Sequence, residues 1–210
     1  MTAAEDARAA FLAQVARAVA PLAPRAGALA SACDLVAVGK GAHLLRAGEV
    51  AGHLLFVHRG LLRYYHLDAA TGEERTGQFF DEGRVYADVA SLVAGTPATV
   101  SVEALEPSAV LRIPRAALYA AYDADHAVER YGRLMLEEAL VGAQRRAANL
   151  LTLGAEARYR AFVVARPEVA RRVPQYLVAS YLGITPEALS RIRGRAARRR
   201  AALTPPRRPR

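Results

Sequence analysis

The chain has 210 residues, of which 53% are hydrophobic and 23% charged, which suffices for one large or two small globular domains. No apolar run approaches the length of a membrane-spanning helix, and the N-terminal residues lack the pattern of a signal peptide. The single cysteine, Cys33, excludes an internal disulfide and a multi-cysteine metal site. We therefore expect a cytoplasmic protein without a membrane partner, in which Cys33 is a small buried residue.

The net charge of +9 is concentrated at one end of the chain. Residues 191–210 hold nine arginines and no acidic residue, so the other 190 residues carry 20 basic and 20 acidic groups. Positive charge gathered in one segment is typical of a protein that binds a polyanion. A compositional bias toward arginine would explain the choice of Arg over Lys, but not this one-ended distribution.

Residues 1–36 are expected to form helices. Apolar residues, including Phe11 and Val15, recur at helical spacing over residues 1–20. Two prolines then break the pattern, and a short second helix is expected over residues 22–35.

The hydrophobic pattern changes to that of β-strands over residues 37–114. Glycines recur about every ten residues, and the short segments between them, such as HLLRAGE and SAVLRIP, alternate apolar and polar residues. Gly60 is predicted inside a hairpin with the sequence FVHRGLLRYY, and Gly72 in a turn. Regular short strands with glycine-rich turns favour a β jelly roll, and the chain as a whole is expected to have an α+β fold.

Metal-dependent enzymes also use jelly rolls, so the four histidines of this segment are candidate metal ligands. Such enzymes usually place two ligands in an HxH arrangement on one strand, and no two of these histidines are two residues apart. No nucleophile signature and no phosphate-cradling glycine loop is present either. We expect neither a metal, a cofactor nor an enzymatic activity; the histidines are His43, His53, His58 and His66.

Residues 115–153 are predicted to form one long helix. Its apolar stripe includes Val128, Tyr131, Met135 and Leu140. A helix of this length needs a partner along that stripe, which is either the jelly roll or a second copy of the chain.

Residues 154–197 are predicted to form a helix-turn-helix domain, with Gly154 as the hinge before it. Gly183 is placed to end one helix in the left-handed conformation, and Thr185 and Pro186 are placed to start the next. Two short helices joined at a glycine-containing turn are typical of a helix-turn-helix. Residues 198–210 contain too few apolar residues for a core and are expected to be a disordered basic tail.

The second helix of this motif has an outward face that suits DNA. Glu187 and Arg191 are four residues apart and share that face; in a major groove, Glu accepts from cytosine and Arg binds guanine. The alternative is an exposed ion pair, worth about 0.3–0.5 kcal/mol. The candidate DNA-binding residues are Thr185, Glu187, Ser190, Arg191, Arg193 and Arg195.

The stretch PQYLVASYLGITPEALSRIR, together with LLRAGE, FVHRGLLR and VEALEPSAVLRIP, resembles the Crp/Fnr-type family of bacterial transcription regulators over nearly the whole chain. The resemblance implies a domain like the cyclic nucleotide-binding domains at residues 37–114 and a dimer helix at residues 115–153. It places Glu187 and Arg191 at base-reading positions, with Thr185 and Ser190 near phosphates. Pro186 stands where many members carry Arg, which points to a different target sequence.

The resemblance also identifies a candidate ligand pocket in the segment VYADVASLVAGTPATVSV. Family members that bind cyclic nucleotides carry a Gly-Glu pair here, followed by an Arg for the phosphate. Ala87 and Asp88 replace the pair, and no arginine occurs between Arg84 and Arg112. The candidate pocket residues are Tyr86, Asp88, Ser91, Thr96 and Thr99.

These features predict a homodimeric, sequence-specific DNA-binding transcription regulator with a sensor-type jelly roll whose ligand is unidentified or absent. Its expected partners are double-stranded DNA and a second copy of itself, with RNA polymerase and an unidentified small-molecule effector as further candidates. The alternatives are a cyclic-nucleotide-responsive regulator and a scaffold protein that binds nucleic acid without selectivity. A jelly-roll metalloenzyme fits the sequence least.

Overall fold

The computed structural model describes residues 1–19 and 26–203. The chain forms two compact units, Met1–Gln144 and Arg145–Arg210. This division falls inside a long helix rather than at Gly154, where the sequence predicts a hinge.

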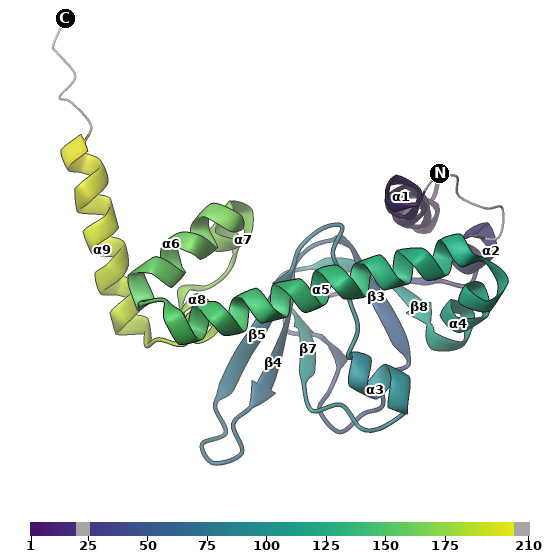
Figure 1. Ribbon diagram of the computed structural model, residues 1–210, viewed down its shortest axis with the longest axis horizontal. Coiled ribbons are helices and arrows are strands. Elements are labelled where there is room, and N and C mark those ends of the chain that lie inside the picture. The colour runs from purple at the N-terminus through teal and green to yellow at the C-terminus, as the bar shows by residue number, and fades with distance from the viewer. Residues whose placement is uncertain (20–25, 204–210) are drawn as a thin grey trace, which may run out of the picture. The chain divides into compact units, whose positions relative to one another are not determined.

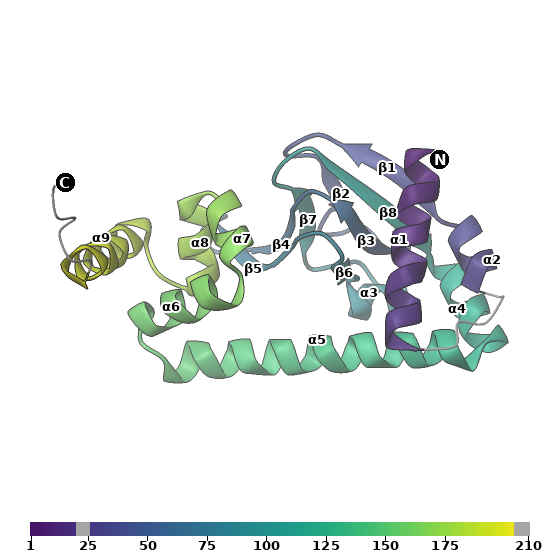
Figure 2. The ribbon, with the colours of Figure 1, turned by 90° about the horizontal axis from the view of Figure 1, so that it is seen from above.

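Unit 1 begins with the predicted N-terminal helix, α1 (Ala3–Ala18). A capping box starts it, because the Thr2 side chain accepts from the Glu5 amide and the Glu5 carboxylate accepts from the Thr2 amide. Phe11 and Val15 are buried, and the helix packs against the first and third strands of the roll (Figure 2). The second helix, α2 (Ala26–Ser31), ends earlier than predicted, since residues 34–38 are already a strand. Residues 22–25, where the prediction placed its start, lie outside the described part of the chain.

The jelly roll is confirmed (Figure 1). It consists of two four-stranded sheets with the orders β1-β8-β3-β6 and β2-β7-β4-β5, all pairs antiparallel. A short helix, α3 (Val89–Ala94), lies between β6 and β7. The strands are β1 (Asp34–Val38), β2 (His43–Leu45), β3 (His53–Arg59), β4 (Leu62–Leu67), β5 (Glu74–Phe80), β6 (Val85–Tyr86), β7 (Ser101–Ala104) and β8 (Ser108–Pro114).

The predicted hairpin around Gly60 is wrong. β3 and β4 belong to different sheets, so the turn at Gly60 carries the chain from one sheet to the other. Gly60 has φ +102°, and a β-carbon there would lie 2.1 Å from the hydroxyl oxygen of Ser108. Only glycine fits this crossing. The turn at Gly72, by contrast, does join the neighbouring strands β4 and β5, as predicted.

The long helix predicted over residues 115–153 is two helices, α4 (Arg115–Ala124) and α5 (His126–Thr152). Asp125 separates them in an extended conformation, with φ −154° and ψ 105°. Its carboxylate accepts from the Ala127 amide at 2.9 Å, which satisfies a free N–H group at the start of α5. An Asp side chain that competes for backbone amides is the physical reason for the break.

Unit 2 contains the end of α5 and four further helices. They are α6 (Ala155–Ala165), α7 (Pro167–Arg172), α8 (Gln175–Leu182) and α9 (Pro186–Leu203). The short helix α7, which begins at Pro167, was not predicted. No strand occurs between residues 154 and 197, so this unit has no β-wing in that range.

Helix α9 also extends beyond the predicted boundary at Ala197. The predicted tail began at residue 198, but the structure continues the helix to Leu203. Ala, Arg and Leu are strong helix formers, which explains the extension. Residues 204–210 lie outside the described part of the chain. Among the described helices, none is long and apolar enough to span a bilayer.

Candidate DNA-binding surface and roll pocket

The turn between α8 and α9 has the predicted geometry. Gly183 adopts the left-handed conformation, with φ 64° and ψ 41°, at the end of α8. The Ile184 amide then donates to the Ala179 carbonyl at 3.1 Å, which closes the helix end. A non-glycine residue would be strained at this φ, so the sharp change in direction depends on Gly183.

The start of α9 is capped by Thr185, as predicted. Its hydroxyl accepts from the Ala188 amide at 3.2 Å, and its carbonyl accepts from the Leu189 amide at 3.0 Å. Pro186 occupies the first helical position, where no amide is needed. Thr185 therefore has a structural role in the motif, in addition to its predicted place near a phosphate.

The inner faces of the two helices pack closely. Ala179 is fully buried, and its small side chain allows α9 to cross α8 at short range. Leu189 and Ile192 of α9 are also buried, whereas Glu187, Ser190 and Arg191 are exposed. Helix α9 thus has one face fixed in the core of unit 2 and the opposite face free of the protein.

The exposed face of α9 carries complementary charges. The pKa of Glu187 lies below its usual value because the carboxylate accepts from its own backbone amide and from the Thr185 hydroxyl, and because Arg191 is near. Glu187 is therefore an ionised acceptor at neutral pH. Arg193 is exposed on one flank of this face, and Arg195 lies on the other, 3.8 Å from Glu156 of α6.

Gly194 also lies on this face, although the residues predicted to bind DNA do not include it. It follows Glu187 by seven residues, so helical spacing places it in the same row, and a β-carbon there would meet only the end of Arg198. The seven-residue spacing was readable from the sequence. A glycine here lets another molecule approach the helix backbone closely.

The predicted pocket residues are only partly brought together. Tyr86 and Asp88 line a pocket of about 190 Å³, together with Glu49 and His53. This volume is below the roughly 300–1,000 Å³ that is common for small-molecule sites. Thr96 and Thr99 are exposed and do not line the pocket.

Ser91 has a structural role instead of lining the pocket. It is 1% exposed, and its hydroxyl accepts from the Ala51 amide at 2.8 Å and donates to the Thr96 carbonyl at 2.5 Å. It therefore ties α3 to the strand region before β3.

Asp88 lies at the N-terminus of α3, where the helix dipole would otherwise stabilise a bound phosphate. Its carboxylate accepts from the Ser91 amide at 3.1 Å and so caps the N-terminus of α3. A phosphate at that point would meet a carboxylate instead of free amides. With no arginine between Arg84 and Arg112, the segment also lacks a bidentate partner for a phosphate.

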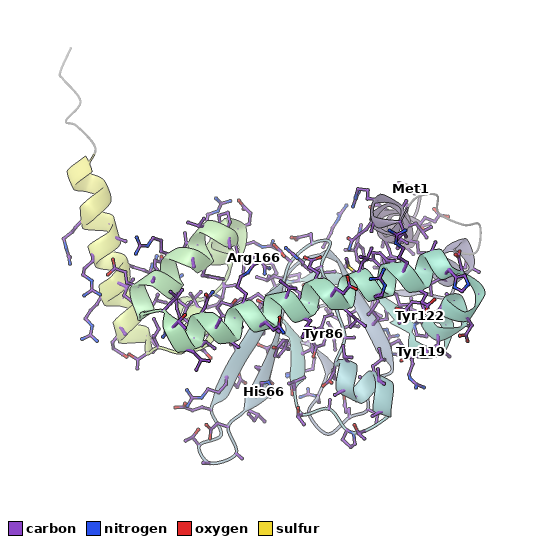
Figure 3. The ribbon with its side chains drawn as sticks, in the orientation of Figure 1. Met1, His66, Tyr86, Tyr119, Tyr122 and Arg166 are labelled. Carbon is purple, nitrogen blue, oxygen red and sulfur yellow. The ribbon has the colours of Figure 1, made fainter. Side chains whose placement is uncertain are left out.

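Three aromatic rings pack together against the aliphatic core of the roll. Tyr86 lies 4.9 Å from Phe80 and 5.6 Å from Tyr64, measured between ring centroids. Burial raises the pKa of the Tyr86 hydroxyl far above its usual value, and Asp88 adds to this effect. Figure 3 shows Tyr86 within the roll. The space around Tyr86 is thus largely occupied by the chain's own side chains.

The structure corrects the predicted dimer face of the long helix, because two of its four residues are buried inside unit 1. Val128 and Tyr131 are 1% and 4% exposed and belong to the core beneath α1, where the Tyr131 hydroxyl accepts from Gln14 at 3.0 Å. Met135 is half-buried against the same core, and Leu140 is 59% exposed.

Five exposed apolar residues of α5 form a different stripe. Their positions alternate by four and three residues, which is the spacing of a coiled-coil seam. This stripe, called the α5 seam below, consists of Leu136, Leu140, Ala143, Ala147 and Leu150, all exposed.

Among the described residues, no group of three His, Cys, Asp or Glu side chains is placed to hold a metal ion. Residues 35–125 match the family of cyclic nucleotide-binding domains. No curated protein matches the chain in sequence.

Solved structures with the same fold include several bacterial proteins. FixK2 from Bradyrhizobium japonicum is 22% identical, with a TM-score of 0.70 over 80% of this chain and 85% of its own. The regulator CLP from Xanthomonas campestris, described as responsive to c-di-GMP, is 16% identical, with a TM-score of 0.66 over 84% of this chain and 91% of its own. A putative regulator of the Crp/Fnr family from Eubacterium rectale is 17% identical, with a TM-score of 0.66 over 81% and 82% of the two chains. Residues 35–125 therefore match a cyclic nucleotide-binding domain, and most of the chain has the fold of these solved structures, one of which is described as a regulator of the Crp/Fnr family.

Proposed function

We propose that this protein is a sequence-specific DNA-binding transcription regulator that acts as a homodimer. The observation that carries the proposal is the exposed face of α9, where Glu187, Ser190 and Arg191 stand outside a helix-turn-helix whose inner face is buried. A recognition helix needs this combination, because the core must fix its direction while its outer side chains reach base edges.

The charged groups of this face suit direct reading of a G·C-containing site. The ionised Glu187 can accept from the amino group of cytosine, and Arg191 can donate two hydrogen bonds to guanine. They lie one turn apart, so neighbouring base pairs are within reach of both. Pro186 has no polar group and adds no base contact, so the target differs from that of a relative with Arg there.

The other arginines support binding to the phosphate backbone. Arg193 and Arg198 are exposed on α9, and residues 191–210 contain no acidic residue. Contacts from these arginines to phosphates carry no sequence information, but they raise affinity and make it depend on salt.

The α5 seam supports homodimerisation. Its leucines and alanines cover almost four turns of exposed helix, with Leu136 52% and Leu140 59% exposed. Small residues such as Ala143 and Ala147 permit a close approach of two helices. Pairing two copies along this seam presents two recognition helices to a pseudo-palindromic site with half-sites about 34 Å apart.

The roll supports a role as a scaffold or as a receptor for a ligand other than a cyclic nucleotide. The capped N-terminus of α3, the filled interior and the small pocket all oppose the binding of a cyclic phosphate. A cyclic-nucleotide-responsive regulator is the second candidate, favoured by the match of residues 35–125 to the cyclic nucleotide-binding domain family. Neither candidate assigns the chain a catalytic role.

Selection of bound fragments from random duplex DNA tests the proposal. The purified full chain is used at about 0.15 M salt, so that electrostatic binding to any sequence is held to its physiological level. We expect a palindrome with half-sites about one helical turn apart. The double variant Glu187→Ala, Arg191→Ala serves as the matched control and should select no sequence. If the unmodified chain also binds without selectivity, with and without added cyclic nucleotide, it is a non-specific nucleic-acid-binding protein instead.

A further inference from the structure

We infer that Arg158 is a positioning residue that fastens the end of the dimer helix to the helix-turn-helix and thereby fixes the half-site spacing that the dimer accepts. The inference rests on the proposed function and concerns unit 2 alone, to which the last residues of α5 belong.

Arg158 joins the C-terminal ends of two helices. It lies in the first turn of α6, where its Nη1 donates to the Leu153 carbonyl at 2.6 Å and its Nε donates to the Leu182 carbonyl at 2.9 Å. Leu153 directly follows α5, and Leu182 is the last residue of α8. Carbonyls at helix ends carry partial negative charge, so a guanidinium between them makes two charge-assisted hydrogen bonds.

A second contact joins the same helices. The Arg146 guanidinium of α5 stacks over the Tyr181 ring of α8, 3.9 Å from its centroid. Tyr181 in turn packs against Phe162 of α6, with ring centroids 5.2 Å apart. These contacts between α5, α6 and α8 form a joint, which has a polar clamp at Arg158 and a stacked layer at Tyr181.

The turn of the helix-turn-helix also lies against α5. A β-carbon at Gly183 would be 3.5 Å from a methyl group of Leu150, which is ordinary contact distance. Leu150 belongs to the α5 seam, and Gly183 sets the direction in which α9 leaves α8. The last residues of the seam, Ala147 and Leu150, and the recognition helix are thus held in one arrangement by contacts within unit 2.

The consequence concerns the geometry of the dimer. If two copies pair along the α5 seam, the distance and angle between the two copies of α9 depend on how each α9 is fixed to its own α5. Arg158 does not face outward with Glu187 and Arg191, because its guanidinium is engaged by the two carbonyls. It should therefore affect half-site spacing without affecting half-site sequence.

The experiment compares Arg158→Met with the unmodified chain on a series of duplexes. The half-site is the one selected by the unmodified chain, and the spacing between two half-sites is the selected spacing or differs by one or two base pairs. Each added base pair rotates one half-site by about 34° relative to the other. Methionine keeps the apolar stem but cannot donate, and Arg160→Met, an exposed arginine of the same helix, is the matched control for lost charge.

We expect the unmodified chain and Arg160→Met to bind about tenfold or more weakly when one base pair is added, since the duplex or the protein must deform. Arg158→Met should show a clearly smaller loss while keeping the same half-site preference. If Arg158→Met shows the same spacing dependence as the unmodified chain, the inference is wrong. If it loses affinity equally for all spacings and sequences, Arg158 only stabilises the fold, and the inference is again wrong.

A second variant covers the case in which Arg158→Met does not fold. Arg146→Met removes the stacking over Tyr181 and leaves the carbonyl clamp in place. It should also make affinity depend less on half-site spacing. If the dependence of affinity on spacing is unchanged, the joint does not fix the spacing. Failure of the proposed function would be seen earlier and differently, since the unmodified chain would then select no half-site at all.

Discussion

Tyr122 lies across Gly132 so closely that a β-carbon at residue 132 would be 2.3 Å from the Tyr122 hydroxyl oxygen and 2.6 Å from the ring. Gly132 is buried within α5, and the absence of a side chain allows α4 to pack against this helix. Burial raises the pKa of Tyr122 to about 12. Figure 3 shows Tyr122 beside Tyr119 at α4.

The Gly132→Ala substitution should destabilise unit 1. Alanine favours a helix by about 1 kcal/mol over glycine, but the overlap with Tyr122 forces a shift that costs about 1–3 kcal/mol. We expect a net loss of stability in urea unfolding followed by circular dichroism. In a Tyr122→Leu background the obstructing ring is gone, so the same substitution should become neutral or stabilising. Equal effects in both backgrounds would contradict the packing described here.

The Arg191→Ala substitution should weaken binding to the selected site. The loss of a bidentate contact to guanine is expected to cost about 1–3 kcal/mol and to relax the sequence preference at that position. Fluorescence anisotropy with matched and mismatched duplexes measures both effects. Arg160→Ala removes the same charge from an exposed position on α6 and should retain the sequence preference; a loss of preference there would point to a general effect of charge.

The Leu140→Glu substitution should convert the proposed dimer to a monomer. It places a charge in the α5 seam, where two copies would bring like charges together at a desolvated contact. Light scattering coupled to size-exclusion chromatography gives the mass directly. The control is Leu67→Glu, at a leucine of β4 that is similarly exposed, 53% against 59% for Leu140. An unchanged mass for Leu140→Glu would place the dimer contact elsewhere.

The Asp88→Ala substitution should lower the stability of the roll. Removing the carboxylate leaves the amide groups at the start of α3 without their cap, which costs about 0.5–2 kcal/mol. Asp88→Ser keeps a capping oxygen and should retain most of the stability, as measured by chemical unfolding. If Asp88→Ala is as stable as the unmodified chain and gains affinity for a cyclic nucleotide, Asp88 guards a functional phosphate site rather than supporting the fold.

The Cys33 thiol should be unreactive at neutral and mildly alkaline pH. Its burial, and to a lesser degree Asp34, raise its pKa to about 11, against an opposing effect of Arg8. At pH 8 only about one thiol in a thousand is then ionised. The fold favours the neutral thiol, so its contribution to stability is complete below pH 9 and is lost as the pH rises toward 11. Labelling by a thiol reagent should therefore be much slower in the folded than in the denatured chain at pH 8.

Much of the fold could be predicted because local sequence rules and tertiary packing agree. The Thr185 cap, the glycine turn at residue 183 and the apolar spacing of α8 each specify the helix-turn-helix independently of the rest of the chain. The glycine-punctuated strands specified a jelly roll for the same reason. Charge distribution and helical spacing then identified Glu187 and Arg191 as the outward face of α9.

Three of the failures share a cause, because each depended on which distant element lies opposite. Gly60 marks a turn in the sequence, but only the pairing of β3 with β8 and β6 shows that the turn joins two sheets. Val128 and Leu140 both belong to an apolar stripe, yet α1 covers only the first of them. Arg158 is one of many arginines, and nothing in its local sequence indicates the two carbonyls that it binds.

The aromatic filling of the roll has a practical consequence. A roll whose interior holds three packed rings can be given a larger pocket by removing one of them. Replacing Tyr86 by alanine would enlarge the pocket that Tyr86 lines and open it toward the rings of Phe80 and Tyr64, against which a small aromatic molecule can pack. The roll is therefore a starting point for an engineered binding site, with the missing ring supplied from solution.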